Sequence, residues 1–389
     1  MRSVTYLDYN ATTQLAPEVL DVMVPLLRDG YGNPSSIHEL GRNAAKVLEE
    51  ARGRVATLAG CREEEILFTS CGTESIHTAI QSALAIDPDK RHIVTTAVEH
   101  SATIRLCEHL AQRGYEITSL PVDSSGRLDL EQLAAAIRPD TALVTLLWAN
   151  NETGVLFPIP EIAEIVKRKK TLLHVDAVQA FGKLPLALGE TDIPFLSASG
   201  HKIHAAKGVA ALYINRRVKF VPLLRGSQEN GRRGGTQNLA SIAGFGVAAD
   251  LARQHINNRQ ILEWRNAFEE NMLSVIPGCR VNGDRTNRLA NTSNLSFEGV
   301  ESEGALILLD KKGLCCSAGS ACTSGSIHPS HVLKAMGFSN ERARASLRFS
   351  FGRYNSQGDL ARACEVIPSV IEKLRALAPA GSPVIRAGK

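Results

Sequence analysis

Short apolar runs alternate with segments of helical periodicity from about residue 15 to residue 235. Between two of these runs, apolar side chains recur at Ile76, Ala79, Ile80 and Ala83 and stop before Pro88. This rhythm predicts an α/β fold with a largely parallel sheet that is buried on both faces and covered by helices. The expected strands are 65–69, 93–96, 143–147, 172–175, 195–198 and 209–214, with a crossover helix at 159–169.

The pattern changes after Gly235. A long helical stretch is expected from about 240 to 275, and short strands are expected near Val281, at 294–297 and at 346–351. We interpret this part as a smaller α+β domain that begins inside the long helix. The predicted division is a large domain at 15–258, a small domain made of 1–14 and 259–378, and a flexible Gly/Pro/Ala-rich tail at 379–389.

Length and charge narrow the class of protein. The chain has 389 residues, of which 44% are hydrophobic, which is enough for two cores. Its 44 basic and 40 acidic residues leave a formal charge of +4 without a basic stripe, so nucleic acid is not an expected partner. No apolar run has the length of a membrane span, and the first residues lack a secretory apolar region, so we expect no membrane association and a cytoplasmic location.

The eight cysteines form no C-x-x-C pair, and a chain of this size does not need disulfides. We expect most of them to be reduced thiols in the core, and Cys71, Cys315 and Cys316 are better explained by packing than by chemistry. No His/Cys cluster has the spacing of a zinc site, so no metal is expected in the active site. His77, His109 and His204 are interpreted as surface or core residues.

Polar residues gather where the predicted strands end, which is where ligands bind in open α/β sheets. Gly72 and Thr73 follow the first strand and begin a helix, so their amides are suited to an anion such as phosphate. Asp176 ends another strand, and a carboxylate buried there needs a positive partner such as a protonated pyridine. Lys202 follows a third strand and could form a Schiff base with an aldehyde cofactor.

Residues 315–326 contain a thiol, Cys322, within a run of glycine, alanine and serine. Such a composition is typical of flexible coil, whereas a packed core would need larger side chains. Together with Lys202, the segment indicates a mobile sulfur nucleophile beside a lysine-bound cofactor. A surface loop with an incidental cysteine is the alternative interpretation.

Several motifs, in this order along nearly the whole chain, resemble those of class V pyridoxal-phosphate enzymes of fold type I. Within that class the chain resembles the group I cysteine desulfurases of the NifS/IscS type, and the stretches 70–75 and 322–326 are more similar to the NifS branch. The motifs are YLDYNATT at 6–13, GNPSSIH at 32–38, NNETG at 150–154, HVDAVQ at 174–179 and GSACTS at 319–324.

The resemblance implies a role for each of the candidate residues. Lys202 would carry pyridoxal phosphate and act as the base, His100 would stack on the ring, Asp176 would pair with the ring nitrogen and Gln179 would bind the ring hydroxyl. Arg348 would bind the substrate carboxylate, because a planar guanidinium suits bidentate pairing with a carboxylate. Cys322 would be the nucleophile. The phosphate would be bound by Gly72, Thr73, Ser199, His201 and the neighbouring subunit's Thr236. Asn151 and Asn10 would lie on the substrate side of the site.

By this resemblance the chain converts L-cysteine to L-alanine and leaves a persulfide on Cys322. The expected partners are a second copy of the chain, which follows from Thr236, and an iron-sulfur scaffold protein that accepts the sulfur, with nitrogenase maturation as a possible pathway. Selenocysteine lyase or another class V activity is the alternative, and a non-catalytic cluster-assembly adaptor is a second one. The chain departs from the family at Ala206, where proline is usual, at Tyr9, and in a shortened loop at 226–229.

Overall fold

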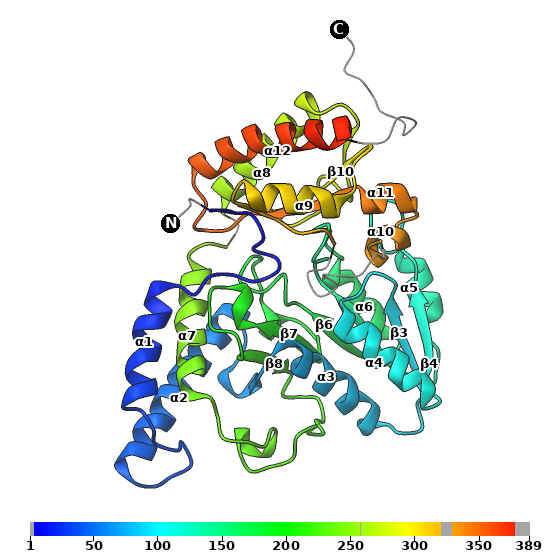
Figure 1. The fold of residues 1–389 in the computed structure, drawn as a ribbon. Coiled ribbons are helices and arrows are strands. Elements are labelled where there is room, and N and C mark those ends of the chain that lie inside the picture. The colour runs from blue at the N-terminus through cyan, green and yellow to red at the C-terminus, as the bar shows by residue number, and fades with distance from the viewer. Residues whose placement is uncertain (1–3, 257, 320–328, 378–389) are drawn as a thin grey trace.

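The computed structural model describes residues 4–256, 258–319 and 329–377. In this part of the chain a large α/β body carries a smaller α+β body on one side (Figure 1). No described helix is both long and apolar enough to cross a membrane. The division into domains at residue 258 stays a prediction, and the packing also crosses it, because Leu289, Val332 and Leu333 join the core of the large body.

A seven-stranded sheet forms the centre of the large body. Only β8 runs opposite to the other six strands, so the sheet is mostly parallel as predicted. Each strand expected from the sequence is present within two residues of its predicted bounds, and β4 is an additional strand at the edge. The strand order is β2 (Ile66–Thr69), β8 (Ala210–Ile214), β7 (Phe195–Ser199), β6 (Leu172–Asp176), β5 (Thr141–Leu147), β3 (His92–Thr96) and β4 (Glu116–Leu120).

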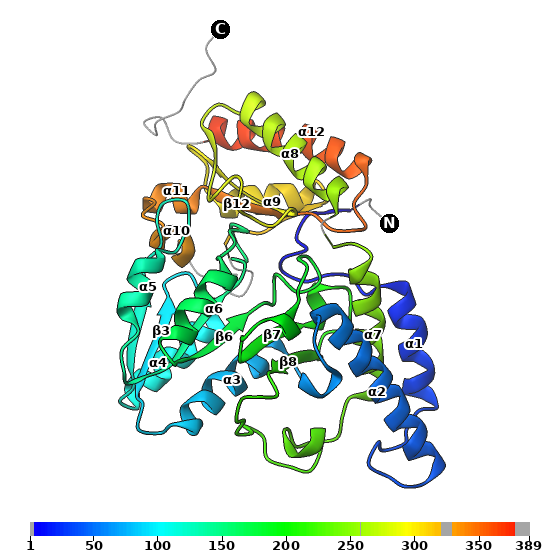
Figure 2. The same ribbon diagram turned by 180° about the vertical axis from the view of Figure 1, so that it is seen from behind.

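Helices cover both faces of this sheet, as Figures 1 and 2 show from opposite sides. Successive strand residues point to opposite faces, so that Leu143 packs towards one helical layer and Val144 towards the other. One layer contains α3 (Gly72–Ile86) and α4 (Ser101–Gln112). The other core contains α1 (Pro17–Arg28), α2 (Glu39–Ala59), α5 (Leu130–Ala136), α6 (Ile159–Arg168) and α7 (Leu239–Arg253).

The single helix predicted over 240–275 is wrong, because the structure contains two helices there. The first, α7, ends at Arg253, and α8 (Arg259–Val275) begins after Asn258. The side chain of Asn258 accepts hydrogen bonds from the amides of Gln260 and Ile261, which would otherwise lack acceptors at a helix start. Asparagine is a strong N-cap residue, so it begins a new helix and interrupts the continuous one.

The small body consists of an antiparallel sheet covered by helices. Its core is rich in aromatic side chains, with Phe268, Phe297, Phe349 and Phe351 all buried. The N-terminal strand β1 (Thr5–Tyr6) pairs with β11 (Leu314–Cys315), which brings residues 7–10 to the junction of the two bodies. The other elements are β9 (Cys279–Val281), β10 (Thr292–Phe297), β12 (Ser346–Ser350), α9 (Ser302–Lys311), α10 (His331–Ala335), α11 (Asn340–Arg344) and α12 (Gln357–Leu377).

Candidate active site

A cavity of about 240 Å³ lies beyond the carboxyl ends of β5, β6 and β7 and the start of α3. This is the edge of a parallel sheet at which ligand sites form. All the predicted site residues that belong to one subunit and lie in the described part of the chain line this single cavity. They are Asn10, Gly72, Thr73, His100, Asn151, Asp176, Gln179, Ser199, His201, Lys202 and Arg348.

Asp176 is a nearly buried carboxylate at the end of β6. Its Oδ1 accepts a hydrogen bond of 2.9 Å from the amide of Val178. Burial raises the pKa of Asp176, and the positive charges of His100 and Lys202 oppose that shift only in part. A cationic N–H placed against this carboxylate would offset the cost of burying it, as expected for a protonated pyridine ring.

Lys202 belongs to a short 3₁₀ turn, Gly200–Lys202, that follows β7. Its Nζ donates hydrogen bonds of 2.6 Å to the carbonyl of Asn10 and 2.7 Å to the carbonyl of Ala11. The N-terminal segment therefore holds the amine at the cavity wall, in a position from which it can react with an aldehyde.

His100 is the N-cap residue of α4. Its Nδ1 accepts a hydrogen bond of 3.2 Å from the amide of Ala102, which fixes the ring at the start of the helix. The imidazole also lines the cavity that contains Asp176 and Lys202. A ring held at this point can stack on a planar cofactor and exchange protons with a substrate above it.

Gln179 lies next to a second lysine that the sequence analysis did not single out. Its Nε2 donates to the Asn10 carbonyl at 2.9 Å, and its Oε1 accepts from Lys183 Nζ at 2.8 Å. These two bonds fix which end of the amide is the donor, so Nε2 keeps a second hydrogen for the cavity. The side chain of Asn10 is itself bonded to Asn151 O, Thr292, Asn291 and Lys183, so its amide group serves to organise the site.

The start of α3 has the backbone groups expected of an anion-binding site. The amides of Gly72 and Thr73 make no hydrogen bond to any other described residue, as usual for the first turn of a helix. A Cβ atom at position 72 would lie 3.1 Å from the Val178 side chain and 3.6 Å from Ser199, so glycine keeps this space open. Burial and the nearby Lys202 lower the pKa of His201 to about 4, which makes it a neutral hydrogen-bonding group at pH 7.

Arg348 provides a second anion site, on the small-body side of the cavity. Its side chain is almost fully buried, with NH2 donating to Asp8 at 2.8 Å and NH1 to the Asn151 carbonyl at 3.1 Å. Its Nε is buried and has no partner among the described residues. A guanidinium with an unsatisfied donor, held rigidly at the cavity, is suited to a substrate carboxylate.

Thr236 lies outside the cavity of its own subunit, in an exposed stretch before α7. Ion pairs hold this stretch against two helices. Arg233 bonds to Glu74 at the start of α3 at 2.9 Å, and the buried Glu229 forms two bonds with Arg52 of α2. Assignment of Thr236 to the neighbouring subunit's phosphate stays a prediction.

Cys322 lies outside the described residues, but the chain on both sides of it is positioned at the cavity. Ser317 pairs with Arg348 through two backbone hydrogen bonds. Gly319 approaches the carboxylate of Glu152, and Ser330 donates to the same carboxylate at 2.5 Å. Glu152 therefore lies between the two described ends of the predicted cysteine loop.

Four residues of the site were not assigned from the sequence: Asp8, Glu99, Glu152 and Lys183. Asp8 and Glu152 occur within motifs that carry the family resemblance, and those motifs were the signal by which both residues could have been found. Glu99 is a fully buried carboxyl whose pKa burial raises to about 8, and one of its oxygens has no partner in the described part of the chain. Lys183 follows Gln179 by four residues, but nothing in the sequence indicates that the two side chains meet.

The chain is similar to known proteins over nearly its whole length. Residues 5–362 match the family model of the class-V aminotransferases. A cysteine desulfurase of Nostoc sp. is 50% identical over 380 residues, which cover 97% of this chain and 95% of that protein. The cysteine desulfurase NifS of Azotobacter vinelandii is 47% identical over 378 residues, or 96% and 94% of the two chains.

Solved structures of NifS-like proteins are also similar to this chain. A NifS-like protein with 34% sequence identity superposes with a TM-score of 0.90 over 96% of this chain and 100% of that one. A NifS-like protein from Rickettsia africae is 31% identical and has a TM-score of 0.84 over 95% and 100%. The chain belongs to the class-V aminotransferase family and, within it, to the pyridoxal-phosphate-dependent cysteine desulfurases.

Proposed function

We propose that this enzyme takes sulfur from L-cysteine, releases L-alanine and leaves the sulfur as a persulfide on Cys322. The main support is that Lys202, Asp176 and Arg348 line one cavity, and that both described ends of the segment carrying Cys322 lie beside it.

The residues present fit pyridoxal phosphate. Asp176 would pair with the ring nitrogen, Gln179 would donate to the ring hydroxyl, and the amides of Gly72 and Thr73 would bind the phosphate. When bound, the cofactor withdraws electrons from the substrate and thereby makes its Cα–H bond acidic and its Cβ–S bond weak. This chain supplies the orientation and the proton transfers.

Substrate orientation is assigned to Arg348, and proton transfer to Lys202. The guanidinium would bind the carboxylate of cysteine, with Asn151 beside it, so that the Cα–H bond faces Lys202. The carbonyls of Asn10 and Ala11 hold the amine of Lys202 at the cavity. From there the amine would take the proton from Cα. His100 would exchange a proton with the substrate sulfur.

Cys322 would attack the sulfur of the substrate. A new S–S bond forms as the Cβ–S bond breaks, and the electron pair of that bond ends in a C–H bond of alanine. Cys322 follows Gly319 by three residues, and an extended chain of that length reaches about 10 Å. Positioning can supply ~7–11 kcal/mol, whereas full ionisation of a thiol supplies at most ~2 kcal/mol at pH 7, so placement matters more than acidity.

A homodimer would complete the site. Large apolar side chains on α1 and the following segment are exposed in the single chain, including Leu27 at 69%, Tyr31 at 81% and Ile37 at 91%. Several large exposed apolar side chains within one stretch of the chain favour a protein interface. The exposed Thr236 would then reach the phosphate bound by the neighbouring subunit.

The sulfur acceptor is proposed to be an iron-sulfur scaffold protein. A persulfide is bound covalently and must be passed to another thiol, so the reaction requires a partner. The similarity to NifS of Azotobacter vinelandii favours nitrogenase cluster assembly as the pathway.

Replacement of Cys322 by alanine tests the proposal. Alanine production from cysteine should be lost, while the cofactor's visible absorbance stays. If alanine production continued unchanged, an activity without a loop thiol, such as selenocysteine lyase, would replace the proposed one.

A further inference from the structure

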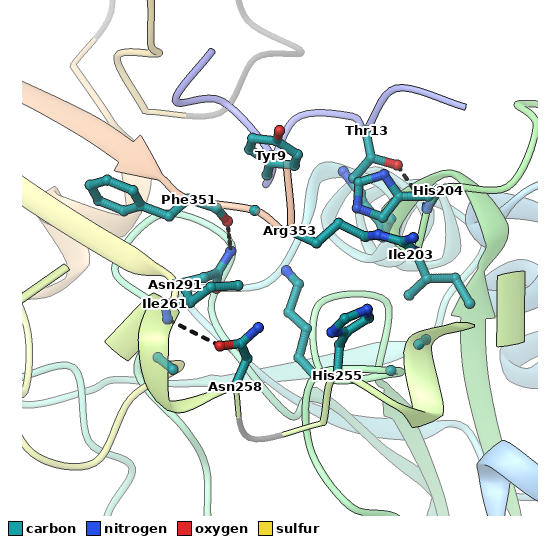
Figure 3. A pocket seen from close by; sticks show the side chains of 16 residues that line it. Tyr9, Thr13, Ile203, His204, His255, Asn258, Ile261, Asn291, Phe351 and Arg353 are labelled. Carbon is teal, nitrogen blue, oxygen red and sulfur yellow. Dashed lines mark hydrogen bonds between the residues drawn. The ribbon is translucent and has the colours of Figure 1, made fainter. Parts of the chain in front are cut away.

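A second cavity, of about 90 Å³, lies between the large and small bodies (Figure 3). It shares only one lining residue, Lys202, with the cofactor cavity. The large body contributes Lys183 and His204, the small body contributes Asn291 and Arg353, and Asn258 lies where the chain passes from α7 to α8. The proposed reaction makes no use of this space.

The lining of the second cavity is positively charged. It includes Lys183 and Arg353, together with Lys202, whose amine the cofactor would take up in the holoenzyme, and it contains no aspartate or glutamate among the described residues. Within the described part of the chain, Lys183 Nζ donates to two neutral amide oxygens and to no carboxylate, with Gln179 Oε1 at 2.8 Å and Asn10 Oδ1 at 3.2 Å. A half-buried ammonium group with no carboxylate beside it is only partly compensated, and a small anion would stabilise its charged form.

Asn258 adds a donor with a fixed direction. Its Oδ1 accepts from the amides of Gln260 and Ile261, so the amide nitrogen must point away from α8. Figure 3 shows this nitrogen directed into the cavity, with Arg353, His204 and His255 around the same space. Arg353 also pairs at 3.7 Å with Glu18, an exposed residue outside the lining.

We propose that the second cavity is a binding site for one small monovalent anion, such as chloride or formate, held by Lys183, Asn258 and Arg353. One water needs ~10–15 Å³ of such space, so the cavity of about 90 Å³ admits a small ion with a few waters and is too small for a nucleotide. Because its ligands come from both bodies, the bound anion joins them across the connection between α7 and α8.

The site is connected to the cofactor cavity by hydrogen bonds. Lys183 bonds to Gln179, and both Gln179 and Lys202 bond to the carbonyl of Asn10. An anion beside Lys183 would favour its charged form and so strengthen its hydrogen bond to Gln179. Occupancy of the second cavity is therefore expected to shift the absorbance of the cofactor.

The anion site should weaken at alkaline pH. Burial lowers the pKa of Lys183 to about 7, with Lys202 and Arg348 acting in the same direction. The other titratable groups around the cavity are Tyr9, His204, His255 and Arg353, and the pKa of His204 is lowered to about 4, so this ring is neutral at pH 7. Since the anion binds the protonated lysine, its affinity should fall by up to ~10-fold per pH unit above that pKa.

The test compares thermal unfolding of the holoenzyme in chloride, bromide or formate with unfolding in gluconate, an anion too large for the cavity, at equal ionic strength. Wild type should be stabilised by the small anions. Asn258→Asp keeps the helix cap but replaces the donor with a negative charge, so this variant should fold and lose the response. Arg348→Gln should keep it, which separates this site from the anion site of the substrate.

Bromide located by anomalous scattering in holoenzyme crystals gives a direct check. A peak among Lys183, Asn258 and Arg353 is expected. Equal chloride responses in wild type and Asn258→Asp, or a bromide peak at Arg348 alone, would overturn the inference. These readouts do not require turnover, so they hold or fail independently of the proposed desulfurase activity.

Discussion

The buried ion pair between Arg52 and Glu229 organises the stretch that leads to Thr236, and Glu229→Gln tests its contribution. Glu229 accepts four hydrogen bonds, two from Arg52 at 2.8 and 3.0 Å, one from the Phe68 amide and one from Gln237. Glutamine has the same shape but places an NH₂ group against two of these donors. The change also leaves the buried guanidinium of Arg52 with the exposed Glu49, at 3.1 Å, as its remaining counter-charge.

Breaking a buried pair by changing one partner costs about 3–5 kcal/mol, and both side chains here are nearly inaccessible, at 6% and 1% exposure. We therefore expect a loss of stability in that range, measured by urea unfolding at one protein concentration and with saturating cofactor. Glu263→Gln is the matched control, because the Arg259–Glu263 pair has a similar bond length of 3.0 Å but is exposed. It should cause no measurable change.

The effect of Glu229→Gln should depend on pH. Burial alone would raise the pKa of Glu229, but the hydrogen bonds and charge of Arg52 hold it below its usual value. The stabilisation is present above the unfolded pKa of ~4.3 and is lost as pH falls towards the folded pKa. The difference between variant and wild type should shrink below about pH 4. Equal losses for Glu229→Gln and Glu263→Gln at pH 7 would refute the reasoning.

Three further changes test the site. Arg348→Gln should raise the KM for cysteine by roughly 10–100-fold, since hydrogen bonds to a charged group contribute ~1.5–3 kcal/mol, and steady-state kinetics would measure it; an unchanged KM would remove Arg348 from substrate binding. Gly72→Ala should reduce retention of the cofactor during dialysis, because its Cβ crowds Val178 at 3.1 Å, whereas Gly304→Ala, whose Cβ would make an ordinary contact with Leu374 at 3.4 Å, should not. Thr236→Ala should also weaken cofactor retention. If the threonine acts across the dimer, mixing Thr236→Ala chains with Lys202→Ala chains should restore retention, whereas no restoration would place the effect of Thr236 within one subunit.

The positions of the strand ends were predictable from the sequence because each buried strand is a short apolar run followed at once by polar residues. Asp176 and Lys202 could be assigned to one edge of the sheet, since parallel strands end on the same side. The edge strand β4 was missed because its residues are mostly exposed or half-buried and form no apolar run. The break between α7 and α8 was missed because the helical periodicity hides the capping role of Asn258.

Contacts between distant segments could not be predicted from periodicity. Lys183 meets Asn10 only because the N-terminal segment crosses the ends of β6 and β7. Glu152 contacts Ser330 only because α10 packs on the large body, although the prediction placed the residues of α10 in the small domain. These contacts depend on tertiary packing, which one sequence does not encode in any local pattern.

A single-turnover reaction of the holoenzyme with L-cysteine, without reductant, tests the central claim most directly. Alanine released and persulfide on the peptide carrying Cys322 would be counted together by mass spectrometry. The account predicts one alanine per persulfide at that cysteine. Alanine formed with the sulfur appearing only as elemental sulfur, and Cys322 unmodified, would contradict it.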